Sequence, residues 1–197
     1  MSSKLLFSVV VICFSVASAA QVQPTAIRPS PFSVGGGIDY WSGDWGRGDI
    51  NRLGPSVWTT LTLWHGLGIN AEGHSMICGG NDIAQDYKYF VAEGGLFYID
   101  DHLLSDLLEL PSNVVQPFAK AELGFGTLSQ PGNGTGQSHF TSNTWAIGGG
   151  VEIHNWRWLW TRVDYTYDGF PNFHSSITNQ YHTLNPRGLT FGETVRF

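Results

Sequence analysis

Apolar and polar residues alternate along most of the chain after residue 31, and this period of two is typical of extended strands and not of helices. The alternation marks eight segments of about ten residues each. They are predicted as strands over 32–41, 56–65, 67–77, 87–99, 116–127, 144–154, 157–167 and 187–197. Because the segments are even in number and similar in length, we expect a single all-β domain over residues 31–197.

The connections between these segments alternate between short and long. Short turns are predicted around Gly66 and around Asn155 and Trp156. Longer polar loops are predicted near 43–54, 78–86, 128–143 and 168–186. An antiparallel up-and-down barrel in a membrane has tight turns on one side and long loops on the other, whereas a soluble sandwich has no reason to sort its loops this way.

The two faces of the segments differ in a way that suits a membrane barrel. In segment 144–154, Ile147 and Val151 lie on one face, and Gly148, Gly150 and Glu152 lie on the other. We assign the apolar face to the outside, because the other face is crowded with glycines and carries opposite charges that can pair. Strands of about 9–11 residues cross the apolar layer, and a barrel of eight has an interior that side chains just fill. The prediction is an eight-stranded antiparallel up-and-down transmembrane β-barrel with a filled polar interior.

The first twenty residues have the three parts of a secretory signal peptide: Lys4, an apolar run over 5–16, and the small residues 17–20. The apolar run is shorter than the ~20 residues of a spanning helix. We therefore expect cleavage of residues 1–20 and a periplasmic segment over 21–30. Cleavage removes Cys13 and leaves Cys78 as the only thiol, so a disulfide framework is excluded.

Composition narrows the function classes. Charged residues make up 13% of the chain, aromatic residues 14%, and the net charge is −6. This profile excludes a coiled coil, a disordered chain and a nucleic-acid-binding protein, which would need a basic surface. Most of the 8 tryptophans lie near predicted strand ends. Aromatic girdles at the membrane interfaces explain them, and a sugar-binding platform is the alternative.

The end of the chain carries a family resemblance. Residues 188–197 read Gly-Leu-Thr-Phe-Gly-Glu-Thr-Val-Arg-Phe, with apolar residues at alternate positions and a terminal aromatic. They resemble the last strand of bacterial outer-membrane proteins, and residues 148–153 and 162–167 resemble the sixth and seventh strands of small eight-stranded barrels similar to the transmembrane domain of outer-membrane protein A. The resemblance implies export to the outer membrane, contact with its lipids, and recognition of Phe197 by the barrel-assembly machinery. We expect a monomer.

Two features depart from this family pattern. Glu193 shares the face of Phe191 and Val195 and would meet lipid unless a bulge shifts the strand. The connection over 100–113 is long for a periplasmic turn, and its leucines recur at helical spacing. We expect a short amphipathic helix over 101–109 that lies against the barrel end or the inner leaflet; a docking surface for a periplasmic partner is the alternative.

The candidate site is a set of charged residues on the inward face of the predicted strands. These residues are Asp39, Glu72, Lys120, Glu122, Glu152, Arg162, Asp164 and Arg196. Glu93 lies on a strand of ambiguous phase and is left outside the set. Acids outnumber bases, and buried unpaired carboxylates are costly. A structural network of salt bridges is the favoured interpretation, and a narrow cation-selective path is the alternative.

Catalysis and metal binding find little support in the sequence. His139 and Ser142 are an odd number of residues apart and would point to opposite faces of one strand. His174 precedes Ser175 and Ser176 in a predicted loop. The seven histidines form no paired ligand spacing. We therefore expect no enzyme activity, no cofactor and no metal, and a structural or surface-interaction role. A narrow channel and an enzyme that modifies lipid A are the alternatives.

Overall fold

The computed structural model describes residues 31–44, 49–76, 88–100, 107, 114–131, 137–175 and 180–197. The predicted signal peptide over 1–20, the segment 21–30 and Cys78 lie outside these residues, as does the expected helix over 101–109 apart from Leu107. No helix in the described residues is long and apolar enough to cross a membrane.

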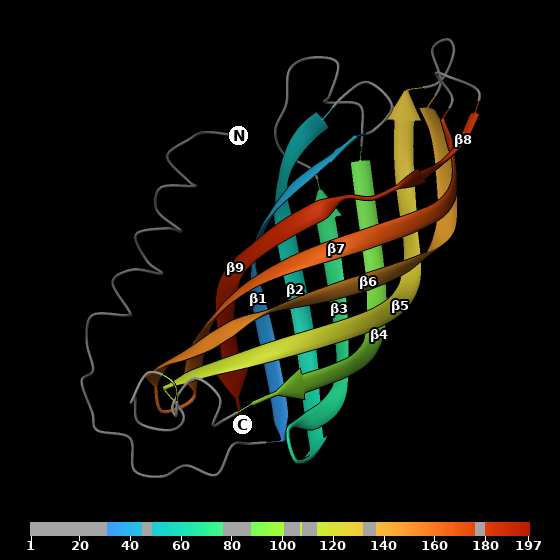
Figure 1. Ribbon diagram of the computed structural model, residues 1–197. Helices are drawn as coiled ribbons and strands as arrows, with labels where there is room; N and C mark the ends of the chain where they lie inside the picture. The colour runs from blue at the N-terminus through green and yellow to red at the C-terminus, as the bar shows by residue number, and fades with distance from the viewer. Residues whose placement is uncertain are drawn as a thin grey trace, which may run out of the picture.

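Nine strands make up the described fold, and eight of them form the barrel wall. The wall strands are β1 (Phe32–Asp44), β2 (Asp49–Trp64), β3 (Leu67–Met76), β4 (Lys88–Ile99), β5 (Val115–Pro131), β6 (Gln137–Trp156), β7 (Leu159–Ser175) and β9 (Arg187–Arg196). The short β8 (Gln180–Leu184) pairs with the outer part of β7 alone. Figure 1 shows the tilted strands of the closed wall, with β8 at the upper right beside the strand ends.

The wall closes because its first and last strands pair with each other. β1 pairs with β9 from Ser33↔Arg196 to Ser42↔Arg187, and β9 pairs with β7 on its other side. All pairings are antiparallel. Closure leaves no open edge around the wall, which is the arrangement that a β structure needs in hydrocarbon. The predicted eight-stranded up-and-down barrel is confirmed.

The connections between the strands lie at two opposite ends of the barrel, here called the turn end and the loop end. The turn end carries the two tight turns, the longer connection from Ile99 to Val115, and both ends of the wall, Phe32 and Phe197, whereas the loop end carries the connections that follow β1, β3, β5 and β7 (Figure 1). At the loop end β2, β5, β6 and β7 run several residues further than the alternation predicted, into the expected loops over 43–54, 128–143 and 168–186. Backbone pairing continues past the apolar band, where side chains no longer need to alternate, and the sequence pattern does not mark that part of a strand.

The turn between β2 and β3 consists of His65 and Gly66. Both have positive φ, at 45° and 78°, as a type I′ turn requires. The amide of Ile99 donates to the carbonyl of Gly66 at 2.9 Å, so the turn is tied to the end of β4. The second tight turn lies at Arg157 and Trp158, two residues later than predicted.

We expect Gly66→Ala to destabilise the barrel by about 1–3 kcal/mol, because a side chain at positive φ is strained. An added Cβ would also lie 2.1 Å from the Ile99 carbonyl oxygen. Gly73→Ala is the matched control, since its Cβ would make only ordinary contacts at 3.5 Å and beyond. Urea unfolding of both variants in detergent measures the difference. Equal stability of the two variants would contradict the importance of this turn.

Candidate functional site: the polar barrel interior

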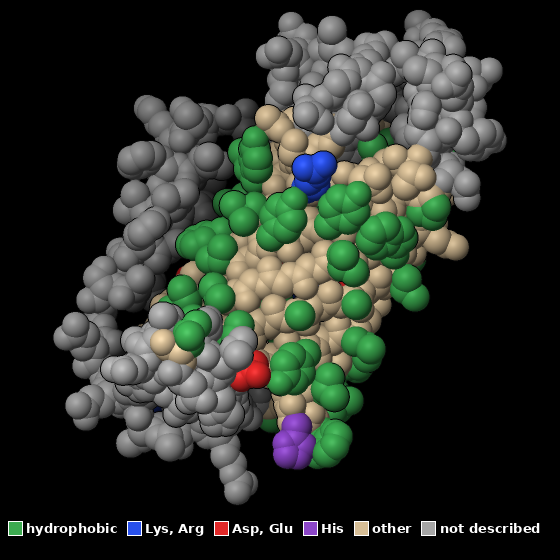
Figure 2. Space-filling view, in the orientation of Figure 1, with side chains coloured by type: hydrophobic (Ala, Val, Ile, Leu, Met, Phe, Trp, Pro, Cys, Tyr) green, Lys and Arg blue, Asp and Glu red, His purple; other side chains and the backbone are tan. Residues whose placement is uncertain are grey.

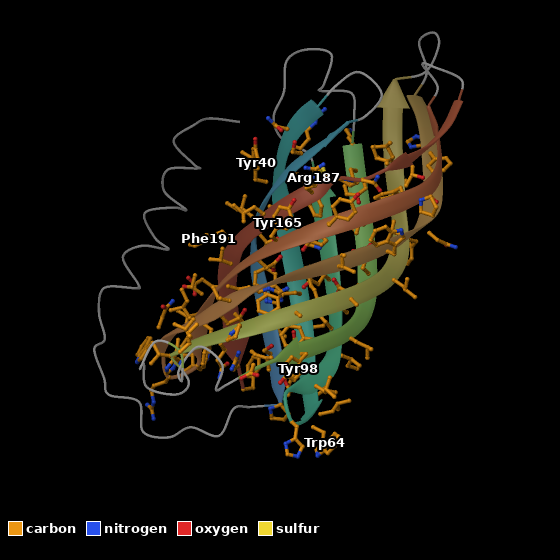
Figure 3. The ribbon with its side chains drawn as sticks, viewed as in Figure 1. Tyr40, Trp64, Tyr98, Tyr165, Arg187 and Phe191 are labelled. Carbon is orange, nitrogen blue, oxygen red and sulfur yellow. The ribbon has the colours of Figure 1, made fainter. Side chains whose placement is uncertain are left out.

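The barrel is apolar on its outside. Large side chains such as Leu96, Leu123 and Val57 are 67%, 73% and 62% exposed. Figure 2 shows hydrophobic side chains spread over the visible outer wall, and Figure 3 shows Tyr40, Tyr165 and Phe191 on that wall with Trp64 and Tyr98 near the turn end. An exterior of this kind is suited to hydrocarbon, because a protein in water rarely exposes so large an apolar surface. The prediction that the apolar face of each strand points outward is therefore confirmed.

Glu193 is an acid on this outer face. It is partly buried, and the hydroxyl of Thr161 on β7 donates to its carboxylate at 2.9 Å. The pairing of β9 with β1 and β7 runs without a shift past this residue, so there is no bulge of the kind suggested to move it. A neighbouring hydroxyl, and not a change of register, accommodates the carboxylate.

Glu72 is the centre of the charged network inside the barrel. Its carboxylate contacts both the Lys120 ammonium and the Arg162 guanidinium, and all three side chains are buried. Arg162 Nε donates to Asp164 at 2.7 Å, and Lys120 lies 3.6 Å from the same carboxylate. Side chains from β3, β5 and β7 therefore meet on the barrel axis as alternating charges. A pair of this kind is stable in a buried site only if each charge has partners and hydrogen bonds.

Neutral side chains add hydrogen bonds to this centre. The Asn70 amide donates to Glu72 at 2.7 Å and to Glu122 at 3.0 Å, and the hydroxyl of Thr60 donates to the Asn70 oxygen at 3.0 Å. The Arg162 guanidinium also lies over the rings of Phe118 and Trp58, at 4.5 and 4.8 Å from their centroids.

His74 extends the network toward the loop end. Its Nδ1 is 2.6 Å from Asp39, and its Nε2 is 3.2 Å from Glu72. The ring is almost fully buried and meets the edge of Trp41 at a centroid distance of 5.5 Å. His74 thus connects Asp39 on β1 to the centre on β3.

Arg196 and Glu152 form a separate pair near the turn end. Arg196 contacts the Glu152 carboxylate, donates to Gln116 at 2.7 Å, and lies 3.8 Å from the ring centroid of Trp160. The two charged residues also line a cavity of about 360 Å³ with Ser33, Thr60 and Ile99. The turn end of the lumen is therefore partly open.

Apolar side chains close the lumen at the loop end. The cluster, here called the apolar cap, consists of Trp41, Met76, Tyr89, Val91, Leu128, Phe170 and Leu184. Each of these side chains is at most 3% exposed, and six strands supply them. The described lumen thus holds, in order from the turn end, the cavity, the charged network and the apolar cap.

The eight residues singled out from the sequence all lie inside the barrel, but in two groups. Seven are buried, and Arg196 is partly exposed at the turn end. Asp39, Glu72, Lys120, Glu122, Arg162 and Asp164 belong to the central network, whereas Glu152 and Arg196 form their own pair. These six charged residues come from four strands of the wall, β1, β3, β5 and β7.

Sequence reasoning missed several interior residues. His74 and Asn70 lie on the polar face of their strand, and that face was the available signal. Glu93 was set aside for its ambiguous phase, and Asp168 was placed in a loop because the alternation fades at Tyr167. Both are buried in the lumen.

The predicted serine and histidine candidates have other partners. His139 Nδ1 lies 2.8 Å from the hydroxyl of Ser129 on β5, and the hydroxyl of Ser142 donates to the Pro171 carbonyl at 3.0 Å. The side chains of His174 and Ser175 are not described, and Ser176 lies outside the described residues.

No family model and no curated protein sequence matches the chain. Solved structures do resemble it. Neisserial surface protein A aligns with a TM-score of 0.67 at 16% identity, over 87% of this chain and 100% of its own. OprG from Pseudomonas aeruginosa aligns with a TM-score of 0.58 at 13% identity, over 86% and 97%. Ail, the attachment invasion locus protein of Yersinia pestis, in complex with the heparin analogue sucrose octasulfate, aligns with a TM-score of 0.56 at 12% identity, over 86% and 100%. At these identities the likeness shows the fold, which is that of small outer-membrane barrels.

We expect Glu72→Gln to lower the free energy of unfolding by about 3–5 kcal/mol, because it leaves Lys120 and Arg162 buried beside a neutral amide. Glu193→Gln is the matched control: it neutralises an outward carboxylate with one described hydroxyl partner, so we expect a change of about 1 kcal/mol or less. Denaturant unfolding followed by tryptophan fluorescence measures both. A stable Glu72→Gln variant would show that the network contributes little.

Proposed function

We propose that the chain is a bacterial outer-membrane barrel protein with a structural or surface-interaction role. The observation that carries this proposal is the state of the lumen, which is occupied by paired charges and closed at the loop end by the apolar cap. A lumen filled in this way stiffens the wall and leaves little room for a solute. We therefore propose that the barrel supports the membrane and that its loop end contacts other molecules.

The proposed location rests on the outer wall and on the fold. An apolar exterior with aromatic side chains toward both ends is typical of outer-membrane barrels. In this proposal residues 1–20 direct export and are removed, outer-membrane lipids surround the wall, and the protein is a monomer without a cofactor. The net charge of −6 gives no overall attraction for a polyanion, so the ligand in the Yersinia complex is not carried over.

A narrow channel is the second candidate, and the cavity at the turn end is the observation that favours it. The apolar cap opposes it. We propose no turnover activity. The hydroxyl of Ser129 lies 2.8 Å from His139 Nδ1, but no carboxylate among the described residues orients the imidazole as the triad of a hydrolase would need.

The location and the closed lumen can be tested on the same protein. We expect the chain in detergent-extracted outer membranes, with heat-modifiable migration on a gel, and no steady conductance when it is reconstituted in planar bilayers. A freely soluble mature protein would contradict the proposed location. Steady conductance that Glu72 or Arg162 variants abolish would favour the channel.

The role of Phe197 can be tested separately. Its ring stacks on Phe32 at a centroid distance of 5.9 Å, and its amide donates to the Phe32 carbonyl at 3.1 Å. Deletion of Phe197 should reduce the amount of folded barrel in cells but leave refolding into detergent intact, because only the first process needs the assembly machinery. Phe32→Ala removes the stacking and keeps the terminal aromatic, so it should assemble normally. Equal assembly defects in both variants would indicate packing and not recognition.

A further inference from the structure

Three polar residues form a row across the outer face of the wall near the loop end. Lys88 on β4 pairs with Ser129 on β5, and Ser129 pairs with His139 on β6. Each has a chain neighbour that belongs to the apolar cap or packs against it; these neighbours are Tyr89, Leu128 and Phe140. Side chains alternate between the two faces of a strand. Lys88, Ser129 and His139, here called the outer polar row, therefore lie on the outside of the wall at the level of the cap.

The outer polar row has hydrogen-bond donors available for a ligand. The hydroxyl of Ser129 lies 2.8 Å from His139 Nδ1. If the hydroxyl donates, the neutral ring carries its proton on Nε2, and if Nδ1 donates, the hydroxyl proton is available. In either case the pair keeps one donor for a ligand. The exposed Lys88 adds three N–H donors and a positive charge beside Ser129, because cross-strand neighbours have Cβ atoms about 4.5–5.5 Å apart.

Hydroxyl and aromatic groups border the outer polar row on the side toward the turn end. Thr127 and Thr141 pair there, and their hydroxyl oxygens lie 3.2 Å apart. Phe90, the neighbour of Thr127 on β4, is 50% exposed, and Phe125, two residues before Thr127 on β5, is 55% exposed. Over these rows the outer wall changes from apolar side chains to hydroxyls and then to a cation. The same order of groups, from acyl chains through sugar hydroxyls to phosphate, occurs in a phosphorylated glycolipid.

The described charges on the outside of the barrel are cations at the loop end. They are Lys88 and Arg187, and none of the described ion pairs includes either residue. Figure 3 shows Arg187 on the wall close to the loop end. Toward the turn end the described charges outside the lumen are Asp100, Glu193 and Arg157, so cations do not prevail there. The outer wall at the loop end therefore attracts anions. The net charge of −6 does not oppose this attraction, because exposed charges more than about 8 Å apart are largely screened at physiological salt.

We propose that Lys88, Ser129 and His139 bind the phosphate of an acylated, phosphorylated sugar of the lipid A type, in the leaflet that surrounds the loop end. The Lys88 ammonium and the available donor of the Ser129–His139 pair hold the phosphate oxygens, and hydrogen bonds from an ammonium to a phosphate are stronger than those between neutral groups. Thr127 and Thr141 face the sugar, and the acyl chains lie along the exposed phenylalanines. A phosphate monoester carries nearly two negative charges, so it suits this row better than the single charge of a glycerophospholipid. This inference rests on the proposed outer-membrane location and assigns a specific lipid to the proposed surface contacts.

Binding can be measured by native mass spectrometry of the full-length mature protein released from detergent, which counts the bound lipid molecules. Lipid A should bind more tightly than the same lipid with its phosphates removed. It should also bind more tightly than phosphatidylglycerol, which carries a single phosphodiester charge. Inorganic phosphate should not displace lipid A, because it lacks the apolar contacts with the wall.

Lys88→Gln and His139→Leu should each weaken lipid A binding about threefold to fivefold, as expected for one exposed ion pair or one hydrogen bond. Neither variant should change the binding of the dephosphorylated lipid. Arg157→Gln is the matched control, because it removes the same charge from an exposed residue at the turn end, and it should leave lipid A binding unchanged. All three side chains are exposed, so we expect the variants to fold, and heat-modifiable migration on a gel checks this.

Any of three results overturns the proposal. The first is equal binding of lipid A and its dephosphorylated form, which would leave only apolar contacts. The second is an equal loss of binding in Lys88→Gln and Arg157→Gln, which would indicate net charge and not a site. The third is that lipid A binds no more tightly than phosphatidylglycerol or is displaced by inorganic phosphate. The first and third results need only the natural protein, so they decide the question even if a variant fails to fold. A wrong location would appear separately, as a freely soluble mature protein.

Discussion

The need of every backbone amide and carbonyl for a partner is the constraint on which this structure depends. In hydrocarbon no water can satisfy these groups, so a β structure has to close on itself. The pairing of β1 with β9 provides that closure. Once the wall is closed around eight strands, its outside is available to apolar side chains, and its inside is too narrow for anything but side chains and a few small cavities.

The charged interior follows from this closure. Strands alternate their side chains between the two faces, so an apolar outside leaves the polar residues in the lumen. Burying them is tolerable only where opposite charges meet, as Glu72 does with Lys120 and Arg162. The network connects strands that are not neighbours in the wall and so braces the barrel across its axis. The paired charges also fill the lumen. For this reason the proposed function is support and surface contact and not transport.

Much of this could be predicted from sequence because alternation carries so much information in a membrane barrel. The strand count, the up-and-down order and the inward face of residues such as Arg162 and Asp164 all follow from a period of two. Where the alternation of apolar and polar residues ends, the sequence no longer predicts where a strand ends. The strands run past their predicted ends near Thr127 and Tyr167, and Asp168 was assigned to a loop, because side chains beyond the apolar band need not alternate.

The sequence by itself determined the fold class and the side of the wall to which each charged residue belongs, since both are properties of one strand at a time. Only the tertiary structure decided which charges meet. His74 joins Asp39 to Glu72 across three strands, and Glu152 pairs with Arg196. The physical reason is that the stagger of the strands and the reach of each side chain set the contacts across a lumen, and neither is encoded in the spacing of residues along a single strand.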